Sequence, residues 1–312
     1  MRFLFIWLIL YFLPIAYLLH APANAQAEKG AQAEKEAQAN TQDIHQKQTH
    51  KRIVSLSMCA DPYLMAFAEP SQILALSPQS RDPSLSAFTE EAAAWPASTG
   101  RMEDILKLAP DLLIISAYSS ATMRALIESF GIQVIVLDAA QNYAAARQEI
   151  LELGELIGRS TQAQAYLTQL DRQLAATQTD IEKDTAIDKA RPPIRYLNYQ
   201  RRGLTIGMGH IIDDIITLAG GVNLGRQIGK SIGPMNLETV IRMQPDFLIT
   251  ESEQQKPIDR GSEILTHPAL TVFFPAEKQI FLPTQLLVCA GATTPQAVAH
   301  IKAEIKAKKR AK

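Results

Sequence analysis

The stretch MEDILKLAPDLLI, residues 102–114, occurs a second time in the chain as LETVIRMQPDFLI, residues 237–249. The two copies match at a constant offset of 135 (238 − 103 = 135), and Glu, Pro, Asp, Leu and Ile are identical in both. Each copy predicts a helix that stops before Pro-Asp and a strand that follows it. Two copies half a chain apart indicate two similarly built lobes, and small ligands bind preferentially in clefts between such units.

Strand-like and helix-like segments alternate around both copies, which predicts an α/β fold with a largely parallel sheet in each lobe. We expect an N-terminal lobe over residues 52–140 and a C-terminal lobe over residues 185–312. Apolar residues at helical spacing fill the stretch between them and predict one long connecting helix over residues 141–184. Gly154 and Gly158 allow a bend in this helix. The expected architecture is therefore two α/β lobes joined by a helix, with the ligand cleft between them.

The N-terminus carries the pattern of a secretory signal peptide over residues 1–25. Arg2 precedes an apolar run, and Ala23-Asn24-Ala25 offers small residues for cleavage before Gln26. The apolar run is almost long enough to span a bilayer, so an uncleaved anchor helix stays open as an alternative. Residues 26–51 are rich in Ala, Gln, Glu and Lys and predict a disordered leader. An exported, periplasmic protein is expected.

Composition and motifs exclude several function classes. The net charge is −1, and no basic stripe is interleaved with aromatic residues, so no nucleic-acid partner is expected. The pair Gly207-x-Gly209 lacks the third glycine of a dinucleotide fingerprint because residue 212 is Ile, and it more simply allows tight turns. No nucleophile elbow or phosphate-binding loop is present, and the histidines are scattered. We expect neither an enzyme, nor a resident metal site, nor a cofactor.

Two further local patterns concern the start of the N-terminal lobe and the cysteines. Asp61-Pro62 is expected to open a helix, with Asp61 as its N-cap and Pro62 at its first position. The chain has two cysteines, Cys59 and Cys289, and each follows a predicted strand. Disulfides persist in exported proteins, so a Cys59–Cys289 bridge is one interpretation, and two separate buried thiols are the other.

The signal peptide, both repeats, the long helix and two further stretches together resemble a known family. The stretches are RIVSLSMCADPYLMAFAEPSQILALSP, residues 52–78, and LTIGMGHIIDDIITLAGGVN, residues 204–223. The family is that of the periplasmic binding proteins (class III, with a helical backbone) that serve ABC importers of ferric siderophores and vitamin B12. The resemblance implies two α/β lobes on a rigid helix, a ligand between them, and docking of Glu103 and Glu238 onto arginines of the inner-membrane permease.

The ligand site is expected at loops that follow the carboxyl ends of strands. Arginines there suit an anionic ferric chelate, because the guanidinium group forks onto carboxylate or catecholate oxygens. The vitamin B12 binder has tryptophans near both repeats, whereas this chain has Gly100-Arg101 and Gly233-Pro234. The candidate ligand-binding residues are Met58, Arg81, Arg101, Tyr118, Arg201, Arg202, Met208, His210 and Met235.

These observations predict a monomeric solute-binding protein that captures a metal chelate, a ferric siderophore or a cobalamin-type ligand, and delivers it to an ABC permease. Two alternatives stay open. A haem-binding protein could use Tyr118, His210 or Met208 as axial ligands. A binder of free zinc or manganese would need several His and acidic ligands near the strand ends.

Overall fold

The computed structural model of the protein describes residues 52–137, 140–186, 192–250 and 259–310. The chain divides into two units, Met1–Thr49 and His50–Lys312, and the fold described below belongs to the second. The expected signal peptide and leader lie outside the described residues. Among the residues that are described, no helix has the length and apolar character needed to cross a membrane.

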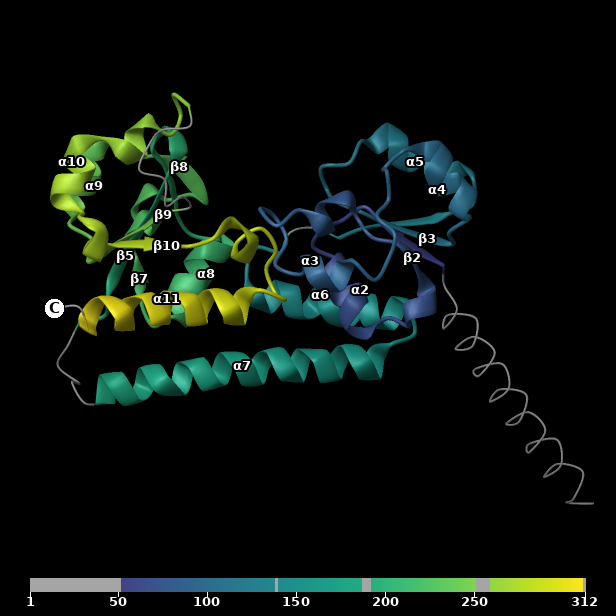
Figure 1. The fold of residues 1–312 in the computed structure, drawn as a ribbon, viewed down its shortest axis with the longest axis horizontal. Helices are drawn as coiled ribbons and strands as arrows, with labels where there is room; N and C mark the ends of the chain where they lie inside the picture. The colour runs from purple at the N-terminus through teal and green to yellow at the C-terminus, as the bar shows by residue number, and fades with distance from the viewer. Residues whose placement is uncertain (1–51, 138–139, 187–191, 251–258, 311–312) are drawn as a thin grey trace, which may run out of the picture. The chain divides into compact units, whose positions relative to one another are not determined.

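The N-terminal lobe is built on a four-stranded, fully parallel sheet (Figure 1). The strand order is β2-β1-β3-β4. The strands are β1 (Ile53–Ser55), β2 (Ile73–Ala75), β3 (Leu112–Ile115) and β4 (Gln133–Val136), and the helices are α2 (Asp61–Phe67), α3 (Thr89–Ala92), α4 (Met102–Leu108) and α5 (Ala121–Ser129). The alternation of helices and strands read from the sequence is confirmed for this lobe.

The C-terminal lobe has a mixed sheet that is parallel over its main part. Strands β10, β9, β5 and β7 run parallel, and β6 and β8 continue the sheet beside β5 in antiparallel pairing. The strands are β5 (Arg195–Gln200), β6 (Leu204–Ile206), β7 (Val222–Asn223), β8 (Ile232–Pro234), β9 (Phe247–Thr250) and β10 (Gln279–Phe281), and the helices are α8 (Ile211–Leu218), α9 (Leu237–Met243), α10 (Pro268–Phe273) and α11 (Thr294–Arg310). The largely parallel α/β character of this lobe is therefore confirmed as well.

Short 3₁₀ helices make many of the connections. They are η1 (Pro70–Gln72), η2 (Pro78–Arg81), η3 (Arg201–Gly203), η4 (Leu224–Ile228), η5 (Glu263–Thr266), η6 (Ala276–Lys278) and η7 (Thr284–Leu286).

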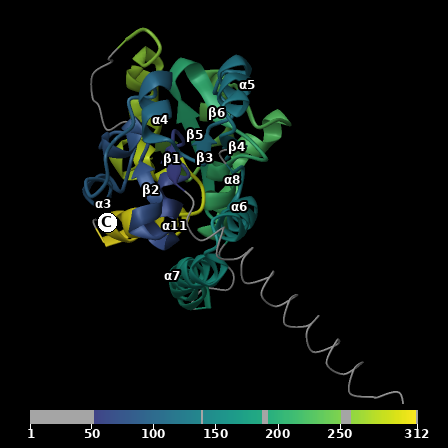
Figure 2. The same ribbon diagram turned by 90° about the vertical axis from the view of Figure 1, so that its right-hand side faces the viewer.

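The segment between the lobes forms two helices, α6 (Tyr143–Leu156) and α7 (Ser160–Ala186), which lie side by side in Figures 1 and 2. The chain turns between them at Gly158, which has a φ of +71° that favours glycine. A Cβ atom on Gly154 would lie 2.3 Å from the Cβ of Ala163, so this glycine lets the two helices approach closely. The prediction of one helix over residues 141–184 is therefore wrong, because the segment forms two helices. The long one, α7, contacts α2 of the N-terminal lobe and α11 of the C-terminal lobe.

One apolar core is shared by both lobes and the helices between them. It includes alternate residues of the central strands, such as Leu112 and Ile114 of β3 and Ile249 of β9, together with residues of α6, α7 and α11. The opposite faces of the two sheets have separate cores of their own, with Leu113 in one and Leu248 in the other. The lobes are therefore held together by apolar burial along their common face as well as by the connecting helices.

The Pro-Asp of the first repeat ties helix α4 to the neighbouring strand. Ala109 ends the helix in the left-handed conformation (φ 45°, ψ 56°), and Pro110 prevents its continuation. The Asp111 carboxylate then accepts a hydrogen bond of 2.7 Å from the backbone N–H of Arg52, directly before β1. The Arg52 guanidinium donates to the last helix carbonyls, 3.0 Å to Ala109 O and 2.7 Å to Leu108 O.

The second repeat forms the same arrangement. Gln244 is left-handed (φ 46°, ψ 61°), and the Asp246 carboxylate accepts a 2.8 Å hydrogen bond from the backbone N–H of Arg195 at the start of β5. The Arg195 guanidinium donates to the carbonyls of Met243 and Gln244. The repeat is thus a structural unit of three parts, a helix, the Pro-Asp turn and an arginine on the adjacent strand, and the arginine was not identified from the sequence.

Replacing this aspartate tests the unit. Asp246→Ala removes the acceptor for the Arg195 amide and is expected to lower the free energy of unfolding by about 1 kcal/mol, because one half-exposed hydrogen bond is lost. Asp246→Asn keeps an oxygen acceptor, so its free energy of unfolding should fall clearly less. Urea unfolding followed by circular dichroism measures both, with the exposed Glu238→Ala as the control. Equal stability of Asp246→Ala and Glu238→Ala would contradict the role given to the aspartate.

Candidate functional site

In a parallel sheet the loops after the strands gather at one edge, here called the carboxyl edge, where ligands of α/β proteins bind. In the N-terminal lobe this edge carries the turn Ser57–Ala60 after β1 and the loop Ser116–Ser120 after β3. In the C-terminal lobe it carries η3 after β5 and the segment after β10. The candidate ligand-binding residues follow from this rule.

Two candidates of the N-terminal lobe lie at its carboxyl edge with accessible side chains. Met58 is half-buried in the turn after β1. Tyr118, in the loop after β3, is 94% exposed, which is unusual for a side chain that normally buries most of its ring. Because the ring of Tyr118 is not buried, it adds almost no hydrophobic stabilisation to the fold. The side chain is therefore accessible to a ligand at this edge.

The two arginines of the N-terminal lobe have local partners. The Arg81 guanidinium donates to the backbone carbonyl of Trp95. Arg101 donates to the Asp104 carboxylate over 3.1 Å and pairs with it at 3.0 Å. Asp104 also accepts a 2.6 Å hydrogen bond from the Thr99 hydroxyl, and these contacts lower the pKa of Asp104, the Thr99 hydrogen bond most. Arg81 and Arg101 are exposed, but each has a structural task at its own site.

Arg201 and Arg202 lie together at the tip between β5 and β6. Arg201 forms an ion pair with Asp259. Arg202 adopts a left-handed conformation (φ 61°, ψ 16°), which costs a residue with a side chain about 1 kcal/mol or more, and its backbone N–H donates to Gly261 O over 2.7 Å. Among the described residues, no acidic side chain pairs with the Arg202 guanidinium. Arg202 is therefore the better placed of the two for an anionic ligand.

The remaining candidates of the C-terminal lobe lie away from the carboxyl edge or below the surface. Met208 and His210 follow β6, and β6 runs antiparallel to β5, so the chain heads back toward the amino ends of the sheet. The strand-end argument used for them therefore does not hold, although Met208 is 49% exposed. Met235 is 7% exposed and packs in the apolar core of this lobe, which leaves little of it for a ligand.

His210 has a defined structural role as the N-cap of α8. Its Nδ1 accepts a 3.2 Å hydrogen bond from the backbone N–H of Ile212, so the neutral ring carries its proton on Nε2. Burial lowers the pKa of His210, and the nearby Asp213 opposes that shift. The ring is thus kept neutral, and ligation of a metal through Nε2 would require the proton to move to Nδ1 and break the cap.

The glycine motifs serve packing. A Cβ on Gly207 would lie 2.0 Å from the carbonyl oxygen of Lys230, and one on Gly221 would lie 2.2 Å from the ring of Tyr196. Asn223, which closes the Gly-Gly-x-Asn segment, donates to Ile206 O over 3.1 Å and to the Asp213 carboxylate over 3.0 Å. Both segments hold α8 against the sheet, and the prediction that the Gly207-x-Gly209 pair allows a tight turn fits the φ of +75° at Gly209.

Asp61 is a buried acid whose role differs from the expected one. It is the first residue of α2, the N-cap position is Ala60, and no side chain caps the helix. The Asp61 carboxylate accepts hydrogen bonds from the Ser77 hydroxyl at 2.5 Å and the Ser77 N–H at 3.2 Å, which join the start of α2 to the segment between β2 and η2. Burial raises the pKa of Asp61 to about 6, while hydrogen bonds from Ser55 and Ser77 oppose the shift.

Glu103 and Glu238 occupy equivalent positions, each the second residue of its helix, α4 or α9. Both are exposed, and within the described part of the chain neither carboxylate has a hydrogen bond or ion pair. Because α4 and α9 run into the amino ends of β3 and β9, their first turns lie toward the carboxyl edges. The two acids are thus presented on the same side of their lobes as the candidate ligand loops.

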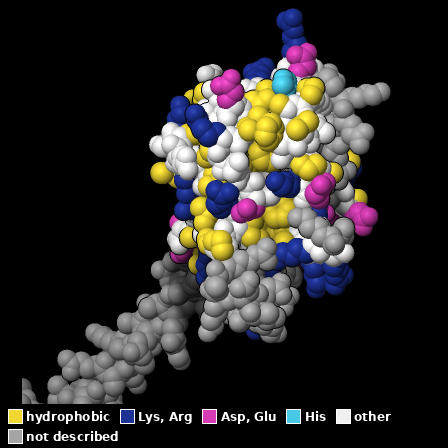
Figure 3. Space-filling model, turned by 90° about the vertical axis from the view of Figure 1, so that its left-hand side faces the viewer, with side chains coloured by type: hydrophobic (Ala, Val, Ile, Leu, Met, Phe, Trp, Pro, Cys, Tyr) yellow, Lys and Arg dark blue, Asp and Glu magenta, His cyan; other side chains and the backbone are white. Residues whose placement is uncertain are grey.

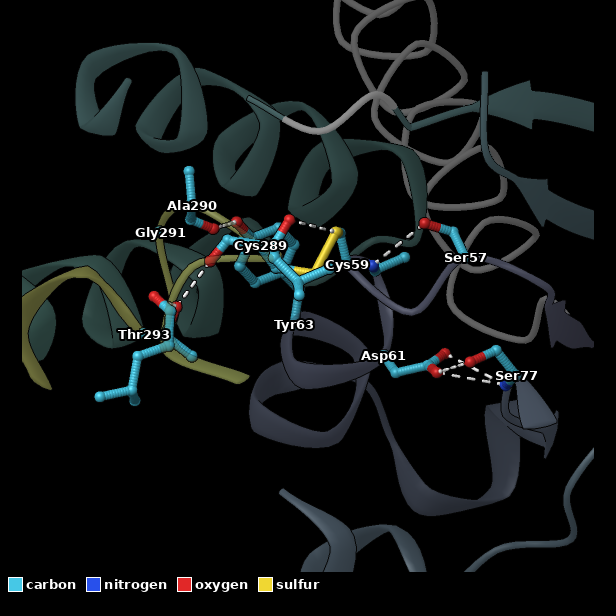
Figure 4. Close-up of a disulfide and its surroundings, with 12 residues drawn as sticks. Ser57, Cys59, Asp61, Tyr63, Ser77, Cys289, Ala290, Gly291 and Thr293 are labelled. Atoms are coloured by element: carbon cyan, nitrogen blue, oxygen red, sulfur yellow. Dashed lines mark hydrogen bonds between the residues drawn. A yellow bond between two sulfur atoms is a disulfide. The ribbon is translucent and has the colours of Figure 1, made fainter. Parts of the chain in front are cut away.

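Cys59 and Cys289 are joined by a disulfide, with their Cα atoms 5.1 Å apart (Figure 4). Cys59 belongs to the turn after β1, and Cys289 to the segment between η7 and α11 that follows β10. The bond therefore joins the turn at the carboxyl edge of the N-terminal sheet to the segment that leaves the carboxyl edge of the C-terminal sheet. Among the described residues, no group of three His, Cys, Asp or Glu side chains could hold a metal ion.

A sequence profile of the periplasmic binding proteins matches residues 53–281, which cover both sheets. The chain belongs to this family. Proteins of the family deliver small ligands to ABC permeases, and the two sheets that meet at their carboxyl edges have the arrangement that such binding needs. No curated protein matches the sequence.

Solved structures of periplasmic binding proteins share the fold over most of the chain. The haem-binding protein RhuT from Roseiflexus sp. RS-1 in its apo form aligns with a TM-score of 0.63 and 23% identity, covering 83% of this chain and 98% of its own. A possible iron-binding protein from Staphylococcus epidermidis gives 0.68 and 15%, with coverage of 82% and 99%. The vitamin B12-binding protein BtuF of Vibrio cholerae gives 0.56 and 20%, with coverage of 84% and 99%. At these identities the likeness shows the class III fold alone.

Exposed apolar side chains also occur away from the candidate site. Figure 3 shows the end of this periplasmic binding protein that carries α9 and α10, where apolar atoms lie among charged ones. Val272 and Phe273 of α10 are 75% and 51% exposed. Because α10 precedes β10, its last turn lies toward the amino edge of the sheet, and these residues are not part of the site.

The buried acid next to the disulfide generates a pH prediction. The pKa of Asp61 is raised from 3.8 to about 6 on folding, so between these values the folded state holds a proton that the unfolded state has released. Stability should therefore fall as pH rises from 4 to 6, by about 2 to 3 kcal/mol from this group. Asp61→Asn keeps an acceptor for Ser77 and removes the ionisation.

Urea unfolding of the wild type and Asp61→Asn between pH 4 and 7.5 measures the effect. The free energy of unfolding of Asp61→Asn is expected to increase relative to that of the wild type as pH rises through this range. Parallel pH profiles of the two proteins would show that the carboxyl group ionises in the folded state at its ordinary pKa.

Proposed function

We propose that the protein is an exported, periplasmic, monomeric solute-binding protein that captures a metal chelate, a ferric siderophore or a cobalamin-type ligand, and delivers it to an ABC permease of the inner membrane. The proposal includes the signal peptide over residues 1–25, cleaved before Gln26. Capture and delivery are the whole function, and no reaction is catalysed. The observation that carries the proposal is the Cys59–Cys289 junction, because it brings the carboxyl edges of two sheets in one family fold to a common place.

The chelate is recognised by side chains from both lobes. Tyr118 and Met58 offer an exposed ring and a flexible thioether on the N-terminal side. Arg202 offers a guanidinium that has no acidic partner among the described residues, on a backbone whose N–H donates to Gly261 O over 2.7 Å. An aromatic face, a soft apolar contact and a fork of N–H donors suit a ligand that is anionic at its rim and apolar elsewhere.

Haem is the second candidate ligand. Tyr118 supports it, since a phenolate can ligate ferric iron axially and this side chain is 94% exposed, with no hydrogen bond from its hydroxyl to another described residue. The similar structures include proteins described as haem-binding, such as RhuT. His210 is the weaker axial ligand because its Nδ1 caps α8. Free zinc or manganese is the remaining alternative. Among the described residues, no three His, Cys, Asp or Glu side chains lie close enough together to bind such an ion.

A thermal-shift panel tests the ligand class. The purified protein is heated with ferric hydroxamate, catecholate and carboxylate siderophores, cyanocobalamin, haemin, zinc chloride and manganese chloride. A ligand at about 100 times its Kd stabilises the folded state by about 2.7 kcal/mol, which corresponds to a rise in Tm of about 5 to 10 °C. One chelate is expected to give such a rise, and a response to the free metals alone would contradict the proposal.

Matched variants locate the bound ligand. Arg202→Gln should weaken binding of the responding chelate by about tenfold or more, because a charge-assisted contact is lost, whereas Arg201→Gln should have a smaller effect since Asp259 already pairs with it. Tyr118→Phe keeps the ring and removes the hydroxyl. If haemin is the ligand, this change must shift the Soret band, and an unchanged band would exclude Tyr118 as the axial ligand.

The docking proposal is tested by charge reversal. We propose that Glu103 and Glu238 dock onto arginines of the permease, so the Glu103→Lys/Glu238→Lys double variant should abolish uptake of the chelate while its affinity stays unchanged. The control reverses one exposed acid in each lobe at a distance from the repeats, Glu90→Lys/Glu277→Lys. Normal uptake by the first double variant, measured with radiolabelled chelate in cells, would contradict docking through these residues.

A further inference from the structure

The chain connects the two lobes a second time through residues 284–293, here called the return segment. It leaves the C-terminal sheet after β10, reaches the disulfide with the N-terminal lobe at Cys289, and enters α11. Its second half is buried, with Cys289 at 6%, Ala290 at 4% and Ala292 at 3% exposure. Loops normally run over the surface, so a buried loop at the junction of two lobes requires specific contacts.

The return segment satisfies its polar groups internally and against the N-terminal lobe (Figure 4). The Tyr63 hydroxyl of α2, itself 1% exposed, donates a 2.8 Å hydrogen bond to Ala290 O. The Thr293 hydroxyl donates to Cys289 O over 2.6 Å, and Gly291 N donates to the Thr294 hydroxyl over 3.0 Å. The segment is thus a fixed piece of structure and not a flexible tether.

Gly291 shows how closely the return segment fits the N-terminal lobe. It has a φ of +88°, and a Cβ at this position would lie 2.3 Å from the Tyr63 hydroxyl and 3.0 Å from the Cβ of Ala146 on α6. Only glycine fits between these two helices in this conformation. Gly291 is therefore packed tightly between Tyr63 and Ala146, two residues from the disulfide at Cys289.

The position of the bond decides what it constrains. The connecting helices α6 and α7 join the lobes along the shared core, whereas the disulfide joins them at the carboxyl edges, where Cys59 follows β1 and Cys289 follows β10. Separation of these edges would require the return segment to leave Tyr63 or the bond to break. The covalent link spans 230 residues of sequence, so it closes a loop that contains most of both lobes, with β1 and α11 outside it.

We propose that the Cys59–Cys289 disulfide is a conformational staple that fixes the separation of the two carboxyl edges, so that this protein binds its ligand with little movement of the lobes. The use of those edges for ligand rests on the proposed function, while the limit on lobe separation does not. The staple raises the fraction of molecules in the binding-competent arrangement, and affinity scales with that fraction.

Single-molecule energy transfer between the lobes tests the staple. Lys107 on α4 and Arg242 on α9 are exposed, lie at equivalent places in the two repeats and are outside the candidate ligand site. Both are replaced by p-acetylphenylalanine and labelled with donor and acceptor dyes. The oxidised protein should give one narrow distribution of transfer efficiency. The Cys59→Ala/Cys289→Ala variant, and the labelled protein reduced with tris(2-carboxyethyl)phosphine, should give a broader distribution shifted to another mean.

Tyr63→Phe is the control, because it removes the hydrogen bond to Ala290 and keeps the disulfide, and its distribution should match that of the oxidised protein. Identical distributions with and without the bond would overturn the proposal. Unfolding of both the variant and the reduced protein would also overturn it, since the bond would then hold the whole fold and not the lobe separation.

The ligand measurement separates this proposal from the proposed function. The chelate that responds in the thermal-shift panel should bind about threefold to tenfold more weakly once the disulfide is removed, as the competent fraction falls. Equal affinity would overturn the link between staple and capture. If no chelate binds the oxidised protein, the proposed function fails, and the energy-transfer distributions still decide whether the disulfide restrains the lobes.

Discussion

The hydrogen bond that an aspartate carboxylate accepts from a backbone N–H at the start of an adjacent strand is the interaction on which both lobes depend. Asp111 makes it to Arg52, and Asp246 makes it to Arg195. In each lobe it joins the strand of the repeat to its parallel neighbour at the first residue of the pair, and the arginine returns to the carbonyls that end the helix. Helix, turn and two strands are thereby fixed as one unit, which places the first turn of α4 or α9 toward the carboxyl edge.

This unit leaves docking and ligand recognition to different residues on the same side of each lobe. Glu103 and Glu238 project from the first turns of the repeat helices and have no task in the described fold. The candidate ligand contacts belong to loops that differ between the lobes, with Tyr118 after β3 and Arg202 after β5. The repeated helices therefore give the two docking glutamates equivalent positions, while residues outside the repeats determine which ligand is bound. The disulfide lies between these regions and restrains the edges that carry them.

The sequence predicted those features that follow from local pattern. The repeat, the alternation of helices and strands and the long helix between the lobes were all expected, since hydrophobic period and Pro-Asp turns are encoded locally. The arginines at positions 52 and 195 were missed because their partners lie more than 45 residues away, although Arg52 directly precedes β1 and Arg195 is the first residue of β5. Asp61 was expected as a cap, but its partner Ser77 lies 16 residues further along the chain, beyond the end of β2.

Three candidate residues lie away from the carboxyl edge or below the surface, and the reason is topological. The rule that ligands lie beyond strand ends assumes parallel strands, and β6 reverses direction after a three-residue turn, which takes Met208 and His210 off the carboxyl edge. A sequence does not reveal that reversal, because a short strand has no directional signal. Met235 follows β8 at the carboxyl edge, but its side chain is buried in the apolar core of the lobe. Which face of the sheet covers a side chain depends on the packing of the whole lobe, so the sequence did not predict this burial.

A crystal structure with the bound chelate tests the central claim most directly, that ligand is held at the meeting carboxyl edges while the repeats face the permease. The account predicts electron density for the chelate in contact with both lobes, within van der Waals distance of Tyr118 and with the Arg202 guanidinium at its anionic rim. Glu103 and Glu238 should stay in solvent. A chelate bound against α4 or α9 with either glutamate as a contact, or one held by a single lobe, would contradict it.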